Sequence, residues 1–400
     1  MLIGIDASRA FVRDKTGTET YSYHLIKTIL RLPESRSHIF VLFIRLNAVL
    51  PKELAGYTNV IVKEVKWRYL WTQIGLAWET YQKFEIRNSK LELGVLWIPA
   101  HTLPILRNPK VQTVVTIHGL EYRWLREYKN WLQRWYLPLS TYYAVKSANR
   151  LIAVSKFSAN QLEKELHTSK NKITVIHEGV ESIVPLHHCT IAPLNKIMGK
   201  NKYVLFVGTI QPRKNLVALI QAFSQTPLDK LIIAGGIGWE TEEIFLAAGK
   251  FGVQEKVVFT GRITDLELQR LYLSAWIYVQ PSITEGFGLP VLEAMAYGVP
   301  VISSDGGALP EVVGEAGIVV PLKLRTSSNK VRNFVTRLAR AMEGATNDQR
   351  LRKRLISMGY KRVKEFSWDK AAKATLKTIM GEGYKSYCTN IPIHHLINTE

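Results

Sequence analysis

The segment WIYVQPSITEGFGLPVLEAMAYGVPVISS, residues 276–304, contains the pattern that decides the fold prediction. It opens with the apolar strand candidate WIYVQPS and closes with a second one, VPVISS. Between them a helical pattern covers 290–297, with Pro290 in its first turn and Gly298 after its last, places where these residues begin and end helices. A strand, a helix and another apolar strand in this order predict a parallel βα unit.

The same alternation fills both halves of the chain, with near-continuous Val and Ile runs that are typical of strands buried in a parallel sheet. Further strand candidates are 2–6, 39–44, 60–65, 94–99, 113–118, 150–155, 173–179, 203–208, 230–235, 257–261 and 317–322. Helices are predicted at 20–32 after a loop at 14–19, at 216–223, from about 240, and at 265–274, 331–342, 349–364 and 367–380. The pattern predicts an α/β protein with two doubly wound domains.

Residues 183–201 interrupt this rhythm with scattered His, Pro, Gly and Lys, so we predict an interdomain linker there. The predicted domains are therefore 1–182 and 202–366. In open parallel sheets ligands bind beyond the carboxyl ends of the strands. Two such sheets in tandem predict a cleft between facing loops.

Composition limits the functional classes. The chain has 400 residues, 46% of them apolar and 22% charged, which is typical of a globular protein of two domains. Its two cysteines, Cys189 and Cys388, predict neither a disulfide framework nor a zinc site. No signal peptide or membrane-spanning stretch is predicted, so we expect a cytoplasmic or peripheral protein. The net charge of +20 favours anionic partners such as nucleic acid, anionic lipid or phosphorylated substrates.

The loop that opens the helix at 290–297 carries the first candidate site. Gly286 and Gly288 allow a tight turn and a close ligand approach, and a helix N-terminus offers unpaired amides to phosphate. Glu285 and Glu293 flank this loop and accept hydrogen bonds from hydroxyls, which are dense on sugars. The alternative is that Glu293 only favours the helix start and that Glu285 is a solvated charge.

A second loop between a strand and a helix reads Gly208-Thr-Ile-Gln-Pro-Arg-Lys-Asn215, with Asn215 as the predicted N-cap. Arg213 and Lys214 are placed to neutralise a diphosphate leaving group as its charge develops. The alternative is a solvated pair of basic residues.

These motifs resemble the family 4 glycosyltransferases of the GT-B fold. The family's Glu-x(7)-Glu motif runs through Gly-Phe-Gly-hydrophobic-Pro and continues as Glu-Ala-Met-Ala-x-Gly-x-Pro-Val, and the chain has every element from Glu285 to Val301. The resemblance implies two Rossmann-like domains facing a central cleft. It also implies retaining, mannosyltransferase-like transfer, with the helix at 367–383 packing back on the N-terminal domain.

The resemblance assigns roles to individual residues. It implies that Glu293 binds the donor ribose and Glu285 a hydroxyl of the transferred sugar, and that the amides of Phe287, Gly288 and Leu289 bind the sugar or its phosphate. The implied catalytic residues are His118, Arg213, Lys214 and Glu285. The implied donor-binding residues are Gly17, Gly208, Arg213, Lys214, Arg262, Ile263, Glu285, Gly286, Phe287, Gly288, Leu289 and Glu293.

The match is weaker in the N-terminal half. His118 follows a strand end, where family members carry a histidine near the reacting carbon, but Gly119 replaces the usual Asp. A lone histidine is also common as a structural residue. Gly17 stands alone where the family has two glycines. Four other residues match the family but receive no role: Phe157, Ser158, Glu178 and Gly179. The resemblance alone places the loop 235–238 and Gly261 near the nucleotide base.

The family mechanism implies retention through a short-lived oxocarbenium ion pair, with the departing phosphate as base. We expect no metal cofactor, because no Asp-x-Asp motif accompanies the loops and the two cations offset the diphosphate. A glycosidase reading of the two carboxylates is disfavoured by their phosphate-binding setting. The expected donor is GDP-mannose, with UDP-sugars as the alternative, and the expected acceptor is a cell-envelope glycan or a lipid-linked one.

Seven of the ten tryptophans fall between Trp67 and Trp135, interleaved with Lys and Arg. This arrangement favours peripheral attachment to an anionic membrane surface, which we expect to be the inner face of the cell membrane. The alternative is that most of these tryptophans belong to the core. Two other functions stay open: a nucleotide-sugar epimerase or hydrolase of the same fold, and a nonenzymatic polyanion or lipid binder. No nucleic-acid-binding module is recognised, so no nucleic-acid partner is expected.

Overall fold

The computed structural model describes residues 1–13, 15–46, 48–67, 69–86, 89–120, 131–181, 203–323 and 330–381. The predicted linker at 183–201 and the tail after 381 lie outside these ranges, so the predicted domain boundaries stay a prediction. Within the described ranges, no helix combines the length and the apolar character that crossing a membrane requires.

The N-terminal half is built on a seven-stranded sheet in the order β3-β2-β1-β6-β7-β8-β9, and every pairing in it is parallel. Buried apolar residues fill its central strands, as the continuous Val and Ile runs predicted. The strands are β1 (Leu2–Asp6), β2 (Ile39–Arg45), β3 (Val60–Val65), β6 (Val95–Ile98), β7 (Gln112–Ile117), β8 (Arg150–Ala153) and β9 (Ile173–Val175).

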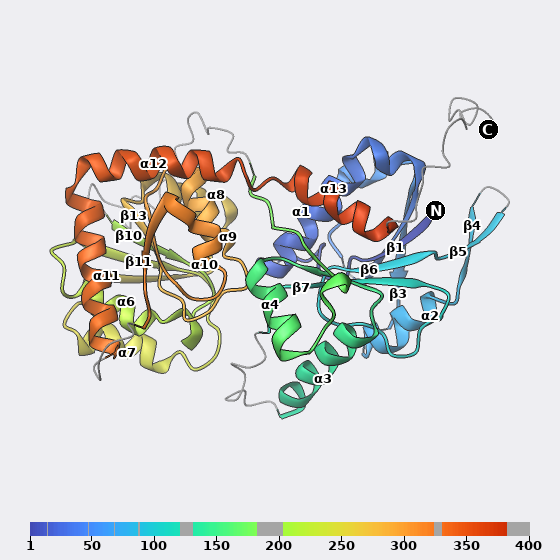
Figure 1. The fold of residues 1–400 in the computed structure, drawn as a ribbon, viewed down its shortest axis with the longest axis horizontal. Coiled ribbons are helices and arrows are strands. Elements are labelled where there is room, and N and C mark those ends of the chain that lie inside the picture. The colour runs from blue at the N-terminus through green and yellow to red at the C-terminus, as the bar shows by residue number, and fades with distance from the viewer. Residues whose placement is uncertain are drawn as a thin grey trace.

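Helices cover both faces of this sheet: α1 (Gly17–Arg31), α2 (Ala77–Glu79), α3 (Trp131–Ser147) and α4 (Lys156–Glu165). Helix α1 begins three residues before the predicted start, because Thr16 and Glu19 form a capping box that satisfies its first amides. The sequence interpretation missed the antiparallel hairpin β4 (Lys83–Ile86) and β5 (Ser89–Glu92), which projects from one end of the molecule (Figure 1). It also placed the end of β9 four residues too late.

The C-terminal half repeats the plan with a six-stranded parallel sheet in the order β12-β11-β10-β13-β14-β15. Its strands are β10 (Tyr203–Val207), β11 (Lys230–Ala234), β12 (Val257–Gly261), β13 (Ile277–Gln280), β14 (Val301–Ser304) and β15 (Gly317–Val320). Its helices are α6 (Leu216–Phe223), α7 (Glu242–Lys250), α8 (Asp265–Ser274), α9 (Leu289–Ala296), α10 (Leu309–Val313), α11 (Lys330–Asn347) and α12 (Gln349–Val363). The short helix α10 was not predicted.

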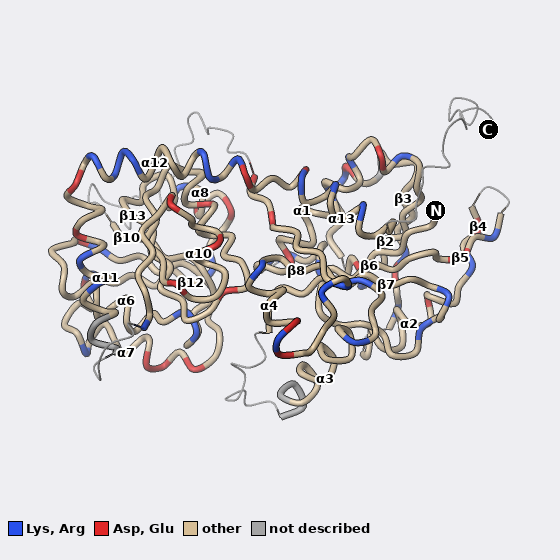
Figure 2. The backbone as a smooth tube through the Cα atoms, viewed as in Figure 1, with Lys and Arg blue, Asp and Glu red and all other residues tan. Residues whose placement is uncertain are grey.

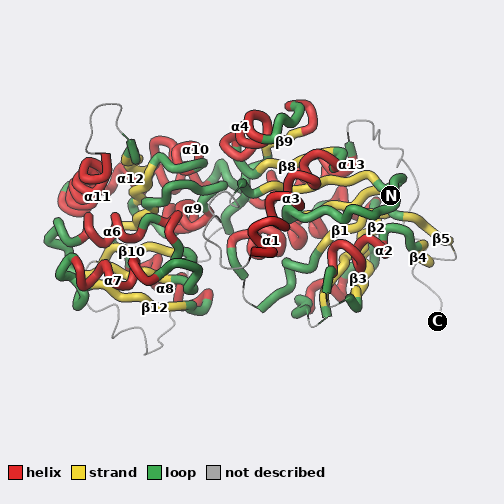
Figure 3. The backbone as a smooth tube through the Cα atoms, turned by 90° about the horizontal axis from the view of Figure 1, so that it is seen from below, coloured by secondary structure: helices red, strands yellow, loops and turns green. Residues whose placement is uncertain are grey.

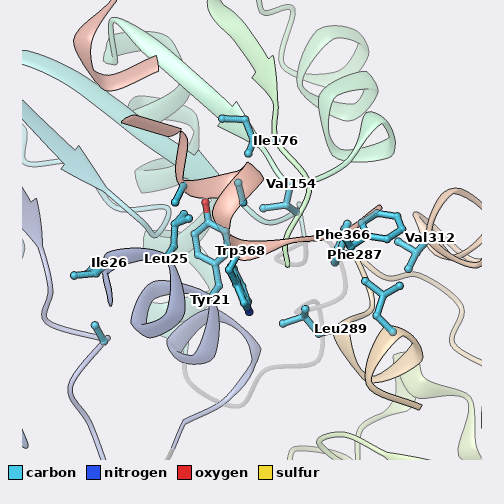
Figure 4. Close-up of a cluster of buried hydrophobic side chains, with 14 of the residues drawn as sticks. Tyr21, Leu25, Ile26, Val154, Ile176, Phe287, Leu289, Val312, Phe366 and Trp368 are labelled. Atoms are coloured by element: carbon cyan, nitrogen blue, oxygen red, sulfur yellow. The ribbon is translucent and has the colours of Figure 1, made fainter. Parts of the chain in front are cut away.

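The two halves lie side by side in two views at right angles to each other (Figures 1 and 3). The last helix, α13 (Trp368–Met380), returns to the N-terminal half and packs on α1, where Trp368 meets the Tyr21 ring at 6.1 Å. Buried side chains from both halves form one apolar cluster, which includes Tyr21, Phe287 and Phe366 (Figure 4). This cluster brings the carboxyl ends of the two sheets together.

Candidate active site

The loops after β7 and β13 touch each other across the two halves. A Cβ atom added to Gly286 would lie 1.8 Å from the His118 carbonyl oxygen, so only glycine permits this approach. On the same side, the Ser155 hydroxyl donates to the Gly286 carbonyl at 2.7 Å. The two sets of loops therefore face each other, as predicted, and Gly286 and His118 lie at their contact.

Glu285 lies at the centre of a buried charge cluster in the C-terminal half. Its Oε2 accepts from the Arg213 guanidinium at 2.9 Å, and its Oε1 accepts from the Lys214 ammonium at 2.6 Å. Gln280 and Ser282 also donate to Oε1, at 2.8 Å and 2.7 Å. Two cations and two neutral donors therefore hold one carboxylate in a single orientation.

This burial rejects the solvated-charge alternative for all three ionic residues. Glu285, Arg213 and Lys214 are 6%, 9% and 8% exposed. Burial alone raises the pKa of the Glu285 carboxyl, but the Lys214 ammonium and the Arg213 guanidinium outweigh it and lower that pKa to about 2. Glu285 is therefore an anion at any physiological pH, and the cluster of two cations and one anion has a net charge of +1.

Backbone contacts bring the two loops of this cluster together. Arg213 and Lys214 lie in the short 3-10 turn Pro212–Lys214, and the Arg213 carbonyl accepts from the Ile283 amide at 2.8 Å. Asn215 occupies the predicted position before α6 but does not cap it with its side chain. Its backbone is left-handed, with φ of 57°, and its side-chain amide donates to the Pro281 carbonyl at 3.2 Å.

Glu293 lies in α9, which begins directly after Gly288, a residue with φ of 109°. The Tyr272 hydroxyl donates to Glu293 Oε2 at 2.8 Å, and the Tyr272 ring stacks on Tyr297 with centroids 5.4 Å apart. Burial raises the pKa of the Glu293 carboxyl, and the hydrogen bond from Tyr272 partly opposes this increase. Glu293 is thus a half-buried acceptor with an oriented side chain, rather than only a residue that favours a helix start.

His118 is 9% exposed and lies at the end of β7. Its Nε2 is 2.9 Å from the Pro99 carbonyl oxygen, which can only accept, so this nitrogen carries the proton. Its Nδ1 is 3.3 Å from Glu178 Oε1, and its ring meets the edge of Tyr21 at 4.6 Å. The side chain therefore lies at the interface of the two halves with an oxygen atom close to each ring nitrogen, and one of these belongs to Glu178, which matched the family without a role.

Most of the other predicted donor residues lie on loops that follow strands of the C-terminal sheet, and Gly17 opens helix α1 in the N-terminal half. Gly208 has φ of 150°, and a Cβ added to Gly235 would lie 2.1 Å from its carbonyl, so these two loops pack backbone to backbone. Arg262 lies against Gly236, and Ile263 packs partly buried on the shared apolar cluster. Gly17 is the first residue of α1, and a Cβ added there would have no atom within 4 Å.

Three residues that orient the site escaped the sequence interpretation. Gln280 and Ser282 bond Glu285, and their signal was present: a buried strand that ends in alternating polar residues is unusual. Tyr272 bonds Glu293 from α8, and nothing in the local sequence around it indicated this contact.

Two family models match the chain in tandem. The model described as Glycosyltransferase Family 4 matches residues 17–182, and the one described as Glycosyl transferases group 1 matches residues 191–362. Among curated proteins, the chain is 29% identical over 273 residues to O-antigen chain mannosyltransferase B of Escherichia coli, an alignment that spans 66% of this chain and 69% of that protein.

Solved structures share the fold. Sucrose-phosphate synthase of Thermosynechococcus elongatus superposes with a TM-score of 0.69 at 18% identity, covering 94% of this chain and 97% of that one. HepE of Anabaena in complex with UDP-glucose gives 0.63 at 16% identity, covering 94% and 98%. The predicted GT-B architecture is confirmed. The chain is a glycosyltransferase and belongs to the two-domain enzymes that join a Family 4 domain to a group 1 domain.

Proposed function

We propose that this enzyme transfers a hexose, with mannose favoured, from a nucleotide-sugar to a cell-envelope glycan or lipid-linked acceptor, with retention at the anomeric carbon. The observation that carries the proposal is the buried cluster of Arg213, Lys214 and Glu285 beside the loop that opens α9. A net positive cluster next to a helix N-terminus suits a diphosphate, and Glu285 and Glu293 suit hydroxyls.

The residues divide the chemistry as follows. The C–O bond between the anomeric carbon and the diphosphate breaks, and Arg213 and Lys214 stabilise the charge that develops on the leaving group. The acceptor oxygen forms the new bond from the same face, and its proton passes to the departing phosphate. Glu285 does not supply a proton, because its pKa of about 2 keeps it ionised. This supports transfer over the general-acid chemistry of a glycosidase.

The names of two relatives support the proposed donor and acceptor. The name of the Escherichia coli relative, O-antigen chain mannosyltransferase B, supports mannose and a cell-envelope acceptor. We therefore favour GDP-mannose, while the UDP-glucose complex of HepE keeps UDP-sugars as the alternative. No divalent metal is needed in this scheme, because the protein's own cations meet the diphosphate.

A thermal-shift panel tests the donor site. GDP-mannose, UDP-glucose, UDP-N-acetylglucosamine and their nucleotides are added to the wild type, to Glu293→Ala and to Glu243→Ala, an exposed glutamate in α7 that serves as the control. A ligand that binds only the native state raises its melting temperature. We expect one nucleotide series to stabilise the wild type and the control but not Glu293→Ala. The absence of any response in the wild type would contradict the proposal.

We further propose that the N-terminal half attaches to an anionic membrane surface. Trp71 and Trp97 are core residues, as the alternative interpretation held, but Trp67, Trp78 and Trp135 are 49%, 63% and 66% exposed. Other exposed apolar side chains belong to the same segments: Tyr69, Leu70, Ile74, Tyr81, Ile105, Leu106, Tyr136, Leu139 and Tyr142. Trp124 and the side chain of Trp131 fall outside the described part.

One side chain joins the segments that carry these rings. Gln73 donates to the Leu103 carbonyl at 3.2 Å and to the Tyr136 hydroxyl at 3.3 Å, and it accepts from the Ile105 amide at 2.9 Å. Within 66–82, 101–112 and 135–147 the sequence has one acidic residue, Glu79, which is buried. Basic positions lie around α2 and β5 (Figure 2), and in the hairpin Lys83 and Lys90 pair with the exposed Glu92 and Glu85. Exposed rings on three segments that carry no exposed acid, with basic residues nearby, fit the headgroup region of an anionic bilayer.

Sedimentation with vesicles tests this attachment. Wild type should sediment with vesicles that contain an anionic phospholipid and not with purely zwitterionic ones. The double variant Trp78→Ala, Trp135→Ala should lose most binding, whereas Tyr360→Ala, an exposed ring of the C-terminal half, should keep it. Equal sedimentation of both variants would reject the surface.

A further inference from the structure

Glu311 belongs to α10 in the C-terminal half, yet its carboxylate contacts the N-terminal half. Its Oε1 accepts from the Lys156 amide at 3.0 Å and its Oε2 from the Phe157 amide at 3.3 Å. These are the first two amides of α4, which have no partner within the helix and lie at its positive end. Glu311 thus completes the N-terminus of a helix in the other half.

The same carboxylate contacts a second residue of the N-terminal half. His177 Nε2 lies 2.6 Å from Glu311 Oε1, and only 18% of the Glu311 side chain is exposed. Burial raises the pKa of Glu311, but the hydrogen bonds from His177 and from the α4 amides outweigh it, and the pKa falls below its ordinary value. The His177 ring packs against Phe287 and Phe366, which lie together in Figure 4.

Short contacts connect Glu311 to the donor loop 285–289 on one side. The Ala308 amide donates to the Glu285 carbonyl at 2.9 Å. Gly307, with φ of 67°, lies so close that an added Cβ would be 2.3 Å from the same oxygen. The segment leading into α10 is therefore packed directly on the backbone of Glu285 and cannot shift without it.

Short contacts also connect α4 both to the donor loop and to His118. Ser155, the N-cap of α4, donates to the Gly286 carbonyl at 2.7 Å, and the Ser158 hydroxyl donates to the His118 carbonyl at 3.1 Å. His177 immediately precedes Glu178, which contacts the His118 ring. Glu311 is therefore linked to the donor loop within its own half and, through α4 and His177, to His118 in the other.

We propose that Glu311 is a positioning residue that holds the donor loop in register with His118 by binding the N-terminus of α4 and His177. The inference rests on the proposed function, in which the donor loop carries the sugar and the N-terminal half presents the acceptor. The proposed nucleotide site lies within the C-terminal half, so nucleotide binding does not need the contacts of Glu311 with Lys156, Phe157 and His177 of the other half. Transfer needs the two halves in register, so it does need Glu311.

The variant Glu311→Gln keeps the side-chain volume and removes the charge and one acceptor. Glu315→Gln, an exposed glutamate four residues later, is the matched control. We expect kcat to fall by about ten- to a hundredfold in Glu311→Gln, the range that a misplacement of roughly 1 Å costs. The Kd for GDP or UDP should stay within about twofold, because a purely positional loss acts on the transfer step. The control should match the wild type in both.

Hydrogen exchange of the donor-free proteins supplies a readout that needs no substrate. The amides of Lys156 and Phe157 should exchange at least about tenfold faster in Glu311→Gln, and those of the control should not. Unchanged kcat or unchanged exchange overturns the inference, and so does a rise in nucleotide Kd that matches the fall in kcat. If Glu311→Gln does not fold, the variant His177→Asn removes the ring that contacts Glu311 from the other half. We expect the same fall in kcat and the same unchanged nucleotide Kd in this variant. Failure of the wild type to bind any nucleotide would instead refute the proposed function.

Discussion

Replacement of Glu285 by glutamine should destabilise the enzyme strongly, although the two side chains have nearly equal volume. The glutamine removes the carboxylate that pairs with both of the buried residues Arg213 and Lys214. Removing one partner from a buried ionic cluster costs about 3–5 kcal/mol. The exposed glutamate Glu243 provides the control, since Glu243→Gln changes the same charge where solvent screens it.

The pKa of Glu285 leads to a similar magnitude. The ordinary pKa of a glutamate side chain is 4.5, and the cations beside Glu285 lower its pKa in the folded protein to about 2. At about 1.36 kcal/mol per pH unit, this difference corresponds to about 3 kcal/mol of stability at neutral pH. For a domain of roughly 150–250 residues, a loss of this size lowers the melting temperature by about 6–12 °C.

The sign of the pH dependence follows from the lowered pKa. Ionised Glu285 stabilises the folded state fully above about pH 4.5, and this contribution is lost as the pH falls toward 2. Scanning calorimetry of the wild type and Glu285→Gln at several pH values should therefore show a large gap at pH 7 that narrows in acid. A gap at pH 7 no larger than that of Glu243→Gln, or one that does not narrow in acid, would refute the reasoning.

Three further predictions concern the site. Gly286→Ala should lower kcat by about a hundredfold, because the added Cβ would overlap the His118 carbonyl oxygen. Gly249→Ala is the control and should retain activity, because its added Cβ has no atom within 4 Å. Equal kcat in both variants would contradict the close contact. Tyr272→Phe should raise the donor KM by about tenfold through loss of a hydrogen bond to a charged group. It should also move the acid limb of donor binding to higher pH, because that bond lowers the Glu293 pKa, and an unchanged limb in a pH titration would count against this role. Activity should survive excess chelator, and a loss that added Mg²⁺ or Mn²⁺ reverses would show a metal requirement.

Most of the fold could be predicted from the sequence, because strands and helices are identified by patterns within a few neighbouring residues. Strands such as β1 and β12, and helices such as α6 and α8, have the predicted bounds within about one residue. The misses have local causes as well. The strands β4 and β5 have four residues each and β5 has one apolar residue, too little to identify a strand, and α10 has five residues, too few to show a helical period.

The candidate site was predicted as a set of motifs but not as an arrangement. Arg213, Lys214 and Glu285 were each identified from their loops, and the structure adds that they pair with one another across 71 and 72 residues of chain. The roles assigned to them stay predictions, as do those of His118 and Glu293. The division of the tryptophans into core and surface also required the tertiary structure, because the segment near Trp67 has no clear period that separates the two faces.

The sequence by itself therefore determined the class of fold, the family and the motif from Glu285 to Val301 that carries the predicted donor site, since each depends on residues a few positions apart. Only the tertiary structure decided that Glu285 is neutralised by two cations, that Tyr272 orients Glu293, and that Glu311 caps a helix 155 residues away. The physical reason is that such contacts depend on how two sheets are placed relative to each other. That placement is set by the summed packing of a core shared by both halves, and no short stretch of sequence contains it.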